Sequence, residues 1–153
     1  SITAADCLPV LVLDRKSGAF ALLHSGWKGT GIVLECIRLM EKRFSSRREE
    51  LYVFMGPGIG KCCYQVNRER FDDFVHDYGI HTGVKTEEGF YIDLREANRL
   101  LLEKSGITDI DIVTDCTYCT PQLLSFRRDG GQRPRVMAVL AGYHTQEKTG
   151  KEI

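Results

Sequence analysis

Apolar and polar positions follow one another along this chain in blocks that predict alternating strands and helices. Residues 8–13 are almost all aliphatic, residues 14–18 are polar and rich in turn formers, and residues 19–24 are apolar again. Two apolar runs joined by a short turn are typical of a β-hairpin. Because the strands of a hairpin are antiparallel, a sheet that contains this pair cannot be purely parallel.

Helical spacing begins directly after the hairpin. Val33, Ile37, Met40 and Phe44 recur on one face and predict an amphipathic helix over residues 30–44, with Thr30 as its N-cap. Further strands are predicted at 51–55, 90–94, 109–114 and 136–141, and further helices at 68–78 and 94–105, the latter with Leu94, Ala97, Leu100 and Leu101 inward. This order predicts an α/β (α+β) fold, a mixed β-sheet sandwich with flanking helices.

Composition and charge then narrow the class of protein. A chain of 153 residues suits one domain, residues 1–153, which can bury a core without disulfides or metal, so we expect the six cysteines to be reduced. Lysine plus arginine and aspartate plus glutamate both total 21, so no net charge attracts nucleic acid or membrane. Neither a signal peptide nor a membrane-spanning run is evident, and we expect a cytoplasmic protein. The oligomeric state is not predicted.

The candidate chemistry is concentrated at Cys7 and His24, which the hairpin brings together. Cysteine and histidine are good zinc or copper ligands, and a catalytic zinc site keeps one position open for water or substrate. The same pair would also serve as a thiolate nucleophile and its base, with Asp6 orienting the imidazole. From the spacing alone, a small buried thiol and a hydrogen-bonded histidine at the strand end are favoured over a metal site, and the spacing does not separate metal binding from the nucleophile and base.

Two further segments are candidates for binding anions. Residues 26–30 end a strand and open a helix, where free backbone N–H groups favour phosphate and Lys28 adds a positive charge. Arg127 and Arg128 precede two glycines and would present guanidinium groups to a phosphate or carboxylate. Ordinary charged turns have the same appearance in a sequence.

The remaining cysteines include a CxxC at Cys116 and Cys119 and an adjacent pair at Cys62 and Cys63. A CxxC is half of many zinc sites or a redox pair. Because there is no second CxxC, the structural-zinc interpretation is weak, and a pairing with Cys62 and Cys63 would require a coincidence of folding. We therefore expect two buried thiols at positions 62 and 63.

Taken in order, these motifs resemble the YfiH/YlmD laccase-domain family. The resemblance rests on residues 3–10 (TAADCLPV), 24–30 (HSGWKGT), 56–66 (GPGIGKCCYQV), 115–119 (DCTYC) and 125–130 (SFRRDG), which cover nearly the whole chain. It implies a YfiH-type fold that has been compared with cysteine hydrolases. It also implies a zinc-dependent purine nucleoside phosphorylase, acting on adenosine, inosine, guanosine and methylthioadenosine with phosphate, and an adenosine deaminase activity.

The resemblance also assigns residues. The family's metal site is His, Cys, His, and its cysteine and second histidine fall on Cys7 and His24, while its first histidine is expected before Ser1, in an amino-terminal segment absent from this chain. Phosphate is expected near residues 29–30 with Lys28 or Arg128, and Lys28 stands where the family usually carries arginine. Membership suggests that the other cysteines are structural. A copper-dependent polyphenol oxidase and a Cys/His hydrolase acting on a cell-wall precursor stay as alternatives, as does a domain that binds a nucleotide or protein without turnover.

Overall fold

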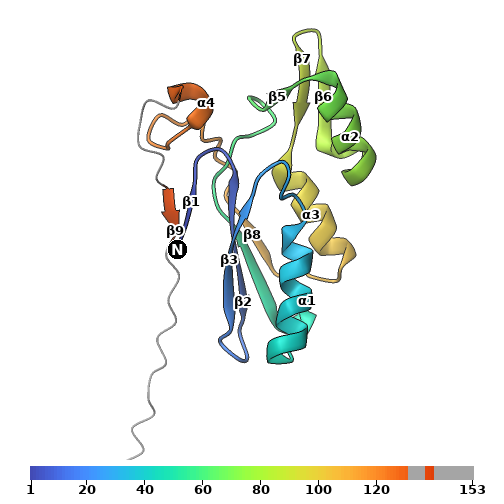
Figure 1. The fold of residues 1–153 in the computed structure, drawn as a ribbon, viewed down its shortest axis with the longest axis vertical. Coiled ribbons are helices and arrows are strands. Elements are labelled where there is room, and N and C mark those ends of the chain that lie inside the picture. The colour runs from blue at the N-terminus through green and yellow to red at the C-terminus, as the bar shows by residue number, and fades with distance from the viewer. Residues whose placement is uncertain (131–136, 140–153) are drawn as a thin grey trace, which may run out of the picture.

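The computed structural model describes residues 1–130 and 137–139 (Figure 1). Its central sheet has four strands in the order β3-β2-β4-β8. They are β2 (Leu8–Asp14), β3 (Phe20–Ser25), β4 (Leu51–Met55) and β8 (Ile110–Ile112). β2 pairs antiparallel with β3 and with β4, whereas β8 pairs parallel with β4. The predicted hairpin and the predicted mixed α+β class are both confirmed.

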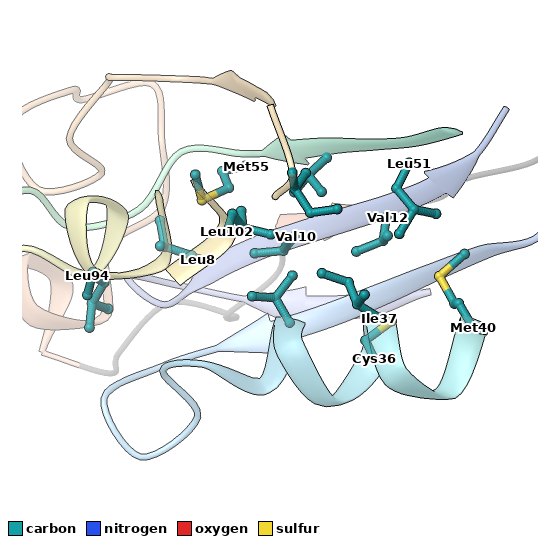
Figure 2. Packing of buried hydrophobic residues seen from close by; sticks show 14 of the residues in the cluster. Leu8, Val10, Val12, Cys36, Ile37, Met40, Leu51, Met55, Leu94 and Leu102 are labelled. Atoms are coloured by element: carbon teal, nitrogen blue, oxygen red, sulfur yellow. The ribbon is translucent and has the colours of Figure 1, made fainter. Parts of the chain in front are cut away.

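Helix α1 (Ile32–Phe44) packs against this sheet beside α3 (Leu94–Lys104). Figure 2 shows Cys36, Ile37 and Met40 of α1 pointing toward Val10 and Val12 of β2. These side chains are all less than a tenth exposed, so they form the centre of the core. Burying them is favourable because it removes apolar surface from water.

The start and end of α1 differ from the prediction. The N-cap is Gly31, at φ 87°, and the hydroxyl of Thr30 instead donates to the carbonyl of Gly26 (3.0 Å). Phe44 is 57% exposed because the helix ends there and the chain turns through Ser45, which has a φ of 55°. Ser46 is buried in its place, and its hydroxyl donates to Asp14 Oδ2 (2.6 Å).

The inward face of α3 also differs from the prediction. Leu94 and Ala97 are buried as expected, but Asn98 and Leu102 complete the face, while the two predicted leucines 100 and 101 are only half-buried. A buried amide is stable here because all its groups are bonded: Asn98 Oδ1 accepts from Ser25 Oγ (3.3 Å) and Gly31 N (3.4 Å), and its Nδ2 donates to Leu94 O (2.7 Å). The side chain thereby ties α3 to the end of β3 and the start of α1.

A smaller unit surrounds α2 (Arg68–Tyr78), whose predicted limits are confirmed. It consists of α2, the sheet β5-β7-β6 and the 3₁₀ turn η2, while a second 3₁₀ turn, η1, precedes β4. The bounds are β5 (Gln65–Val66), β6 (Gly83–Thr86), β7 (Gly89–Ile92), η1 (Arg48–Glu50) and η2 (Ile80–Thr82). β7 ends before the predicted residue 94 because the Asp93 side chain caps α3, accepting from Arg95 N and Glu96 N. β5 and β6 were not predicted.

The amino terminus forms β1 (Ile2–Ala4), which pairs antiparallel with β9 (Met137–Val139) at the side of the molecule (Figure 1). β9 lies within the predicted strand 136–141, whose other residues are outside the described ranges, and β1 was not predicted. A short helix, α4 (Phe126–Asp129), lies above β1 in the same view. None of the helices in the described ranges is long and apolar enough to cross a membrane.

Candidate functional site

The β2–β3 hairpin places Cys7 and His24 at one end of the central sheet. His24 lies opposite Pro9 in the register, and Cys7 is the residue before β2. Both side chains face Gly26: a Cβ placed on Gly26 would lie 2.8 Å from Cys7 Sγ and 3.9 Å from His24 Nε2. Because Gly26 has no side chain, the sulfur and the imidazole nitrogen share an open space there.

The imidazole of His24 is oriented by β1. Its Nδ1 lies 2.9 Å from the carbonyl oxygen of Thr3. A carbonyl oxygen only accepts, so Nδ1 carries a proton, and in the neutral imidazole Nε2 has the lone pair. Metal-binding histidines are commonly held in this way, with the second ring nitrogen donating to a carbonyl or carboxylate. The structure therefore presents Nε2 as a ligand or base on the side of Cys7.

Asp6 does not orient His24, so that sequence prediction is wrong. Its Oδ1 accepts from Thr117 Oγ1 (2.7 Å) and its Oδ2 accepts from Arg127 N (2.8 Å), while the Thr3 carbonyl occupies Nδ1 of the imidazole. Asp6 has a φ of 78°, an uncommon conformation for a residue with a side chain. The two bonds to Asp6 thus hold a strained residue directly before Cys7.

Cys7 lines two adjoining cavities. One, of about 360 Å³, is also lined by Tyr64, Phe126 and Arg127, and the other, of about 310 Å³, by His24 and Phe126. Burial, followed by the negative charge of Asp6, raises the pKa of the Cys7 thiol. Without a bound cation the thiol is therefore neutral, which disfavours the thiolate nucleophile of a cysteine hydrolase.

Lys28 lies away from this pair. It lines a separate cavity of about 320 Å³ together with Trp27 and Tyr78, and its Nζ is 5.8 Å from the centre of the Trp27 ring. The backbone N–H groups of residues 29–32 already donate within the protein. This arrangement provides little of the free N–H surface that the sequence suggested for phosphate, and the role of Lys28 stays a prediction.

Arg128 makes different contacts from the adjacent Arg127. Its guanidinium donates to the carbonyls of Thr117, Tyr118 and Leu123, among others, and pairs with Asp129. It thereby orders the loop after β8, and its predicted contact with phosphate stays a prediction. The cavity beside Cys7 is lined by Arg127 instead, whose guanidinium lies 5.0 Å from the Tyr64 ring centre and donates to Gln65 O.

The structure brings together the four cysteines of the CC and CxxC motifs. Cys62, Cys63, Cys116 and Cys119, hereafter the cysteine cluster, have Sγ atoms that all lie within 4.8 Å of one another. The prediction that Cys62 and Cys63 are buried thiols unconnected to the CxxC is wrong, since Cys62 is exposed and Cys63 half-buried. Burial alone would raise the pKa of Cys116, but N–H groups, first that of Gly60, and the Cys62 thiol lower it to about 7. Among the residues that the structure describes, the cysteine cluster is the group of at least three potential ligands (His, Cys, Asp or Glu) that lie close enough together to hold a metal ion.

The fold defines a mixed α+β domain, with a cysteine and a histidine brought together at one end of its central sheet. More particularly, the chain belongs to the family described as multi-copper polyphenol oxidoreductase laccase, whose model matches residues 1–142. This confirms the family to which the motifs were compared.

Similar proteins agree with this assignment. The chain is 35% identical over 146 residues to a purine nucleoside phosphorylase of Bacteroides thetaiotaomicron, covering 90% of this chain and 54% of that protein. It is 34% identical to the purine nucleoside phosphorylase YlmD of Geobacillus stearothermophilus, and the match covers 89% of this chain and 53% of YlmD. The crystal structure of YlmD from the same organism superposes with a TM-score of 0.77, over 84% of this chain and 51% of that one. The hypothetical protein YfiH of Bacillus licheniformis is 32% identical with a TM-score of 0.78, covering 84% and 52% of the two chains. The chain spans about half the length of the curated relatives it matches.

Several site features were not found from the sequence. The Thr3 carbonyl carries no side-chain signal, and Tyr64 and Phe126 are not distinguishable from other aromatic residues by spacing. The cysteine pairs were visible as motifs, but their convergence depends on the parallel pairing of β4 with β8.

Proposed function

We propose that this chain is a zinc-dependent purine nucleoside phosphorylase that also deaminates adenosine, and that it works in the cytoplasm. The observation that carries the proposal is the convergence of Cys7 Sγ and His24 Nε2 over Gly26, beside a cavity of about 360 Å³. The names of the relatives indicate the substrates: a purine nucleoside, with phosphate as second substrate. We propose adenosine, inosine, guanosine and methylthioadenosine as the nucleosides.

Cys7 and His24 suit zinc as ligands. A thiolate and a neutral imidazole are donors that zinc prefers, and the Thr3 carbonyl accepts from Nδ1 of His24, which leaves Nε2 as the nitrogen that can bind the metal. Bound zinc supplies positive charge that polarises an oxygen and lowers the pKa of a water molecule. Among the described residues, no third His, Cys, Asp or Glu lies close enough to this pair to complete a group of three ligands. Cys7 and His24 are therefore the two ligands that we propose.

The cavity beside Cys7 offers groups that suit a purine nucleoside and phosphate. Tyr64 and Phe126 present aromatic faces on which a purine can stack, and the guanidinium of Arg127 can bind an oxyanion. In phosphorolysis a phosphate oxygen forms a bond to C1′ of the ribose while the C1′–N9 bond breaks and its electron pair stays with the purine. Lys28 and Arg128 stay as predicted contributors of positive charge to this step.

Product analysis tests the activity directly. We expect phosphate with inosine to give hypoxanthine and ribose 1-phosphate, and phosphate with adenosine to give adenine and ribose 1-phosphate. Water and adenosine should give inosine and ammonia. Both phosphorolysis and deamination should be lost after chelation and restored by zinc. Cys7→Ser and His24→Ala should abolish both reactions. Cys36→Ala, a cysteine in the core of α1, is the matched control and should retain them. Absence of every product from protein that holds zinc at the Cys7–His24 pair would sink the proposal.

The family description favours a copper-dependent polyphenol oxidase as the second candidate. Metal analysis separates the two, because this candidate requires stoichiometric copper and oxygen uptake that depends on a phenol. A Cys/His hydrolase would instead resist chelators and lose activity when iodoacetamide alkylates Cys7. The bonding of Asp6 to Thr117 and Arg127 rather than to His24 weighs against this hydrolase.

A further inference from the structure

We propose that the cysteine cluster binds one zinc ion as a structural site, separate from the Cys7–His24 pair. The Sγ atom of Cys119 lies 3.8 Å from that of Cys62 and 3.2 Å from that of Cys63, and all four sulfurs lie within 4.8 Å of one another. Four thiolates bound tetrahedrally at about 2.3 Å from zinc stand about 3.8 Å apart. The sulfur separations are therefore close to those that one zinc ion needs.

The donor set selects the type of metal site. All six cysteines are free, and the separations of Cys119 Sγ from the sulfurs of Cys62 and Cys63 are well beyond the roughly 2.05 Å of a disulfide. Four sulfur ligands are soft and exclude magnesium and calcium, which prefer oxygen. A closed set of four protein ligands leaves no position for substrate, as in structural rather than catalytic zinc sites.

The fold brings the two halves of the cluster to the same edge of the central sheet. β4 and β8 are parallel, so the loops that follow them, which carry Cys62 with Cys63 and Cys116 with Cys119, leave the sheet in the same direction. Gly58 pairs with Cys116 in a parallel bridge that fixes the second loop against the first. The ligands are thus positioned by the backbone.

Backbone and side-chain donors support the ligands themselves. The N–H of Gly60 donates to Cys116 Sγ (3.2 Å), which stabilises a thiolate. A Cβ on Gly60 would lie 3.2 Å from Cys62 Sγ and 2.7 Å from Arg95 Nη2, so a guanidinium stands directly behind the cluster. Arg95 also donates to Val113 O and Asp115 O, which hold the start of the second loop. Its positive charge offsets the net negative charge of a zinc ion with four thiolates.

The cluster also supports the segment that bears Cys7. Thr117, inside the CxxC turn, donates to the buried Asp6, the residue before Cys7. Arg128 holds the same turn through the Thr117 and Tyr118 carbonyls. Zinc in the cluster would therefore fix the turn on which the position of Cys7 depends.

The first experiment uses the whole chain with Cys7→Ser and His24→Ala combined, so that zinc at the other proposed site does not contribute. We expect one zinc per chain after purification with zinc, and an X-ray absorption spectrum with four sulfur ligands at about 2.3 Å. Zinc well below one per chain, a shell of nitrogen and oxygen, or iron as the bound metal would overturn the proposal. The result does not depend on phosphorylase activity, so the two proposals fail separately.

The second experiment removes one ligand. In the same double-variant background, Cys119→Ser should weaken zinc binding at least tenfold and remove the rise in Tm that zinc produces, while Cys36→Ala retains both. Cys119 is exposed, so serine there leaves the packing of the core intact. Unchanged zinc affinity and an unchanged four-sulfur shell in Cys119→Ser would contradict the assignment. If that variant does not fold, the absorption spectrum of the first experiment still decides.

Discussion

Replacing Gly26 with alanine tests whether Cys7 and His24 act as one site. Gly26 does not have a positive φ, so alanine can adopt its backbone conformation. The new methyl carbon would lie 2.8 Å from Cys7 Sγ, about 1 Å inside a comfortable contact. The only relief that leaves the backbone in place is a rotation of the Cys7 side chain, which moves its sulfur away from Nε2 of His24.

The size of the effect follows from these contacts. Overpacking a core usually costs about 1–3 kcal/mol, and we expect the low end, about 1 kcal/mol of unfolding free energy, because one rotation relieves the contact. Once the sulfur is removed, the nearest atom is Cys7 Cβ at 3.7 Å, an ordinary contact. Alanine at position 26 should therefore cost almost nothing when position 7 is also alanine.

A double-mutant cycle measures this directly. Urea unfolding of the wild type, Gly26→Ala, Cys7→Ala and the combined variant should give a coupling of about 1 kcal/mol, above the usual error of additivity. Zinc affinity of the Cys7–His24 pair should also fall roughly 10–100-fold in Gly26→Ala, the range seen when the support of a metal ligand is disturbed. An equal loss of stability in both backgrounds, with unchanged zinc affinity, would refute the reasoning.

Three further predictions concern single side chains. Burial alone would raise the pKa of Asp14, but hydrogen bonds from Ser46 and two backbone N–H groups lower it from 3.8 to about 2. The ionised carboxylate therefore contributes about 2 kcal/mol to the free energy of unfolding above pH 4, and this contribution is lost as the pH falls through 2. In urea unfolding measured from pH 7 to pH 2, Asp14→Asn should remove this pH dependence of stability, and a variant whose stability falls in parallel with the wild type would contradict it. Thr117→Val, which removes the donor to buried Asp6, should cost about 1–3 kcal/mol in the same assay, and no change would count against that bond. Arg127→Gln should weaken phosphate binding about tenfold in a phosphorolysis assay, a loss of about 1.4 kcal/mol, and an unchanged KM for phosphate would exclude Arg127 from the site.

Local sequence patterns were sufficient for elements whose limits are set by neighbouring residues. β4 and α2 have the predicted bounds, because turn formers flank the first and Asn67 and Gly79 cap the second. Sequence patterns did not predict the elements and buried positions that depend on tertiary contacts. Asn98 belongs to the core only because Ser25 and Gly31 supply its partners, and β1 is a strand only because β9 pairs with it.

The same distinction between local and tertiary structure applies to the residues of the candidate site. Cys7 and His24 could be associated from the sequence because a hairpin is a local structure with a defined register. The roles of Arg127 and Arg128 could not be separated, since adjacent residues point in different directions and only the packing of the loop after β8 distinguishes them. The cysteine cluster could not be derived because it requires a strand pairing between distant segments.

The parallel pairing of β4 with β8 also has a consequence for the order of folding. The strands β2, β3 and β4 follow one another and can pair early, whereas closing a long loop to add β8 is entropically costly and slow. Cys63 and Cys119 are 56 positions apart, so during synthesis the first cysteine pair leaves the ribosome well before its partners. We expect the late arrival of β8 to bring the four thiols together, which makes metal uptake one of the last events in the maturation of this domain.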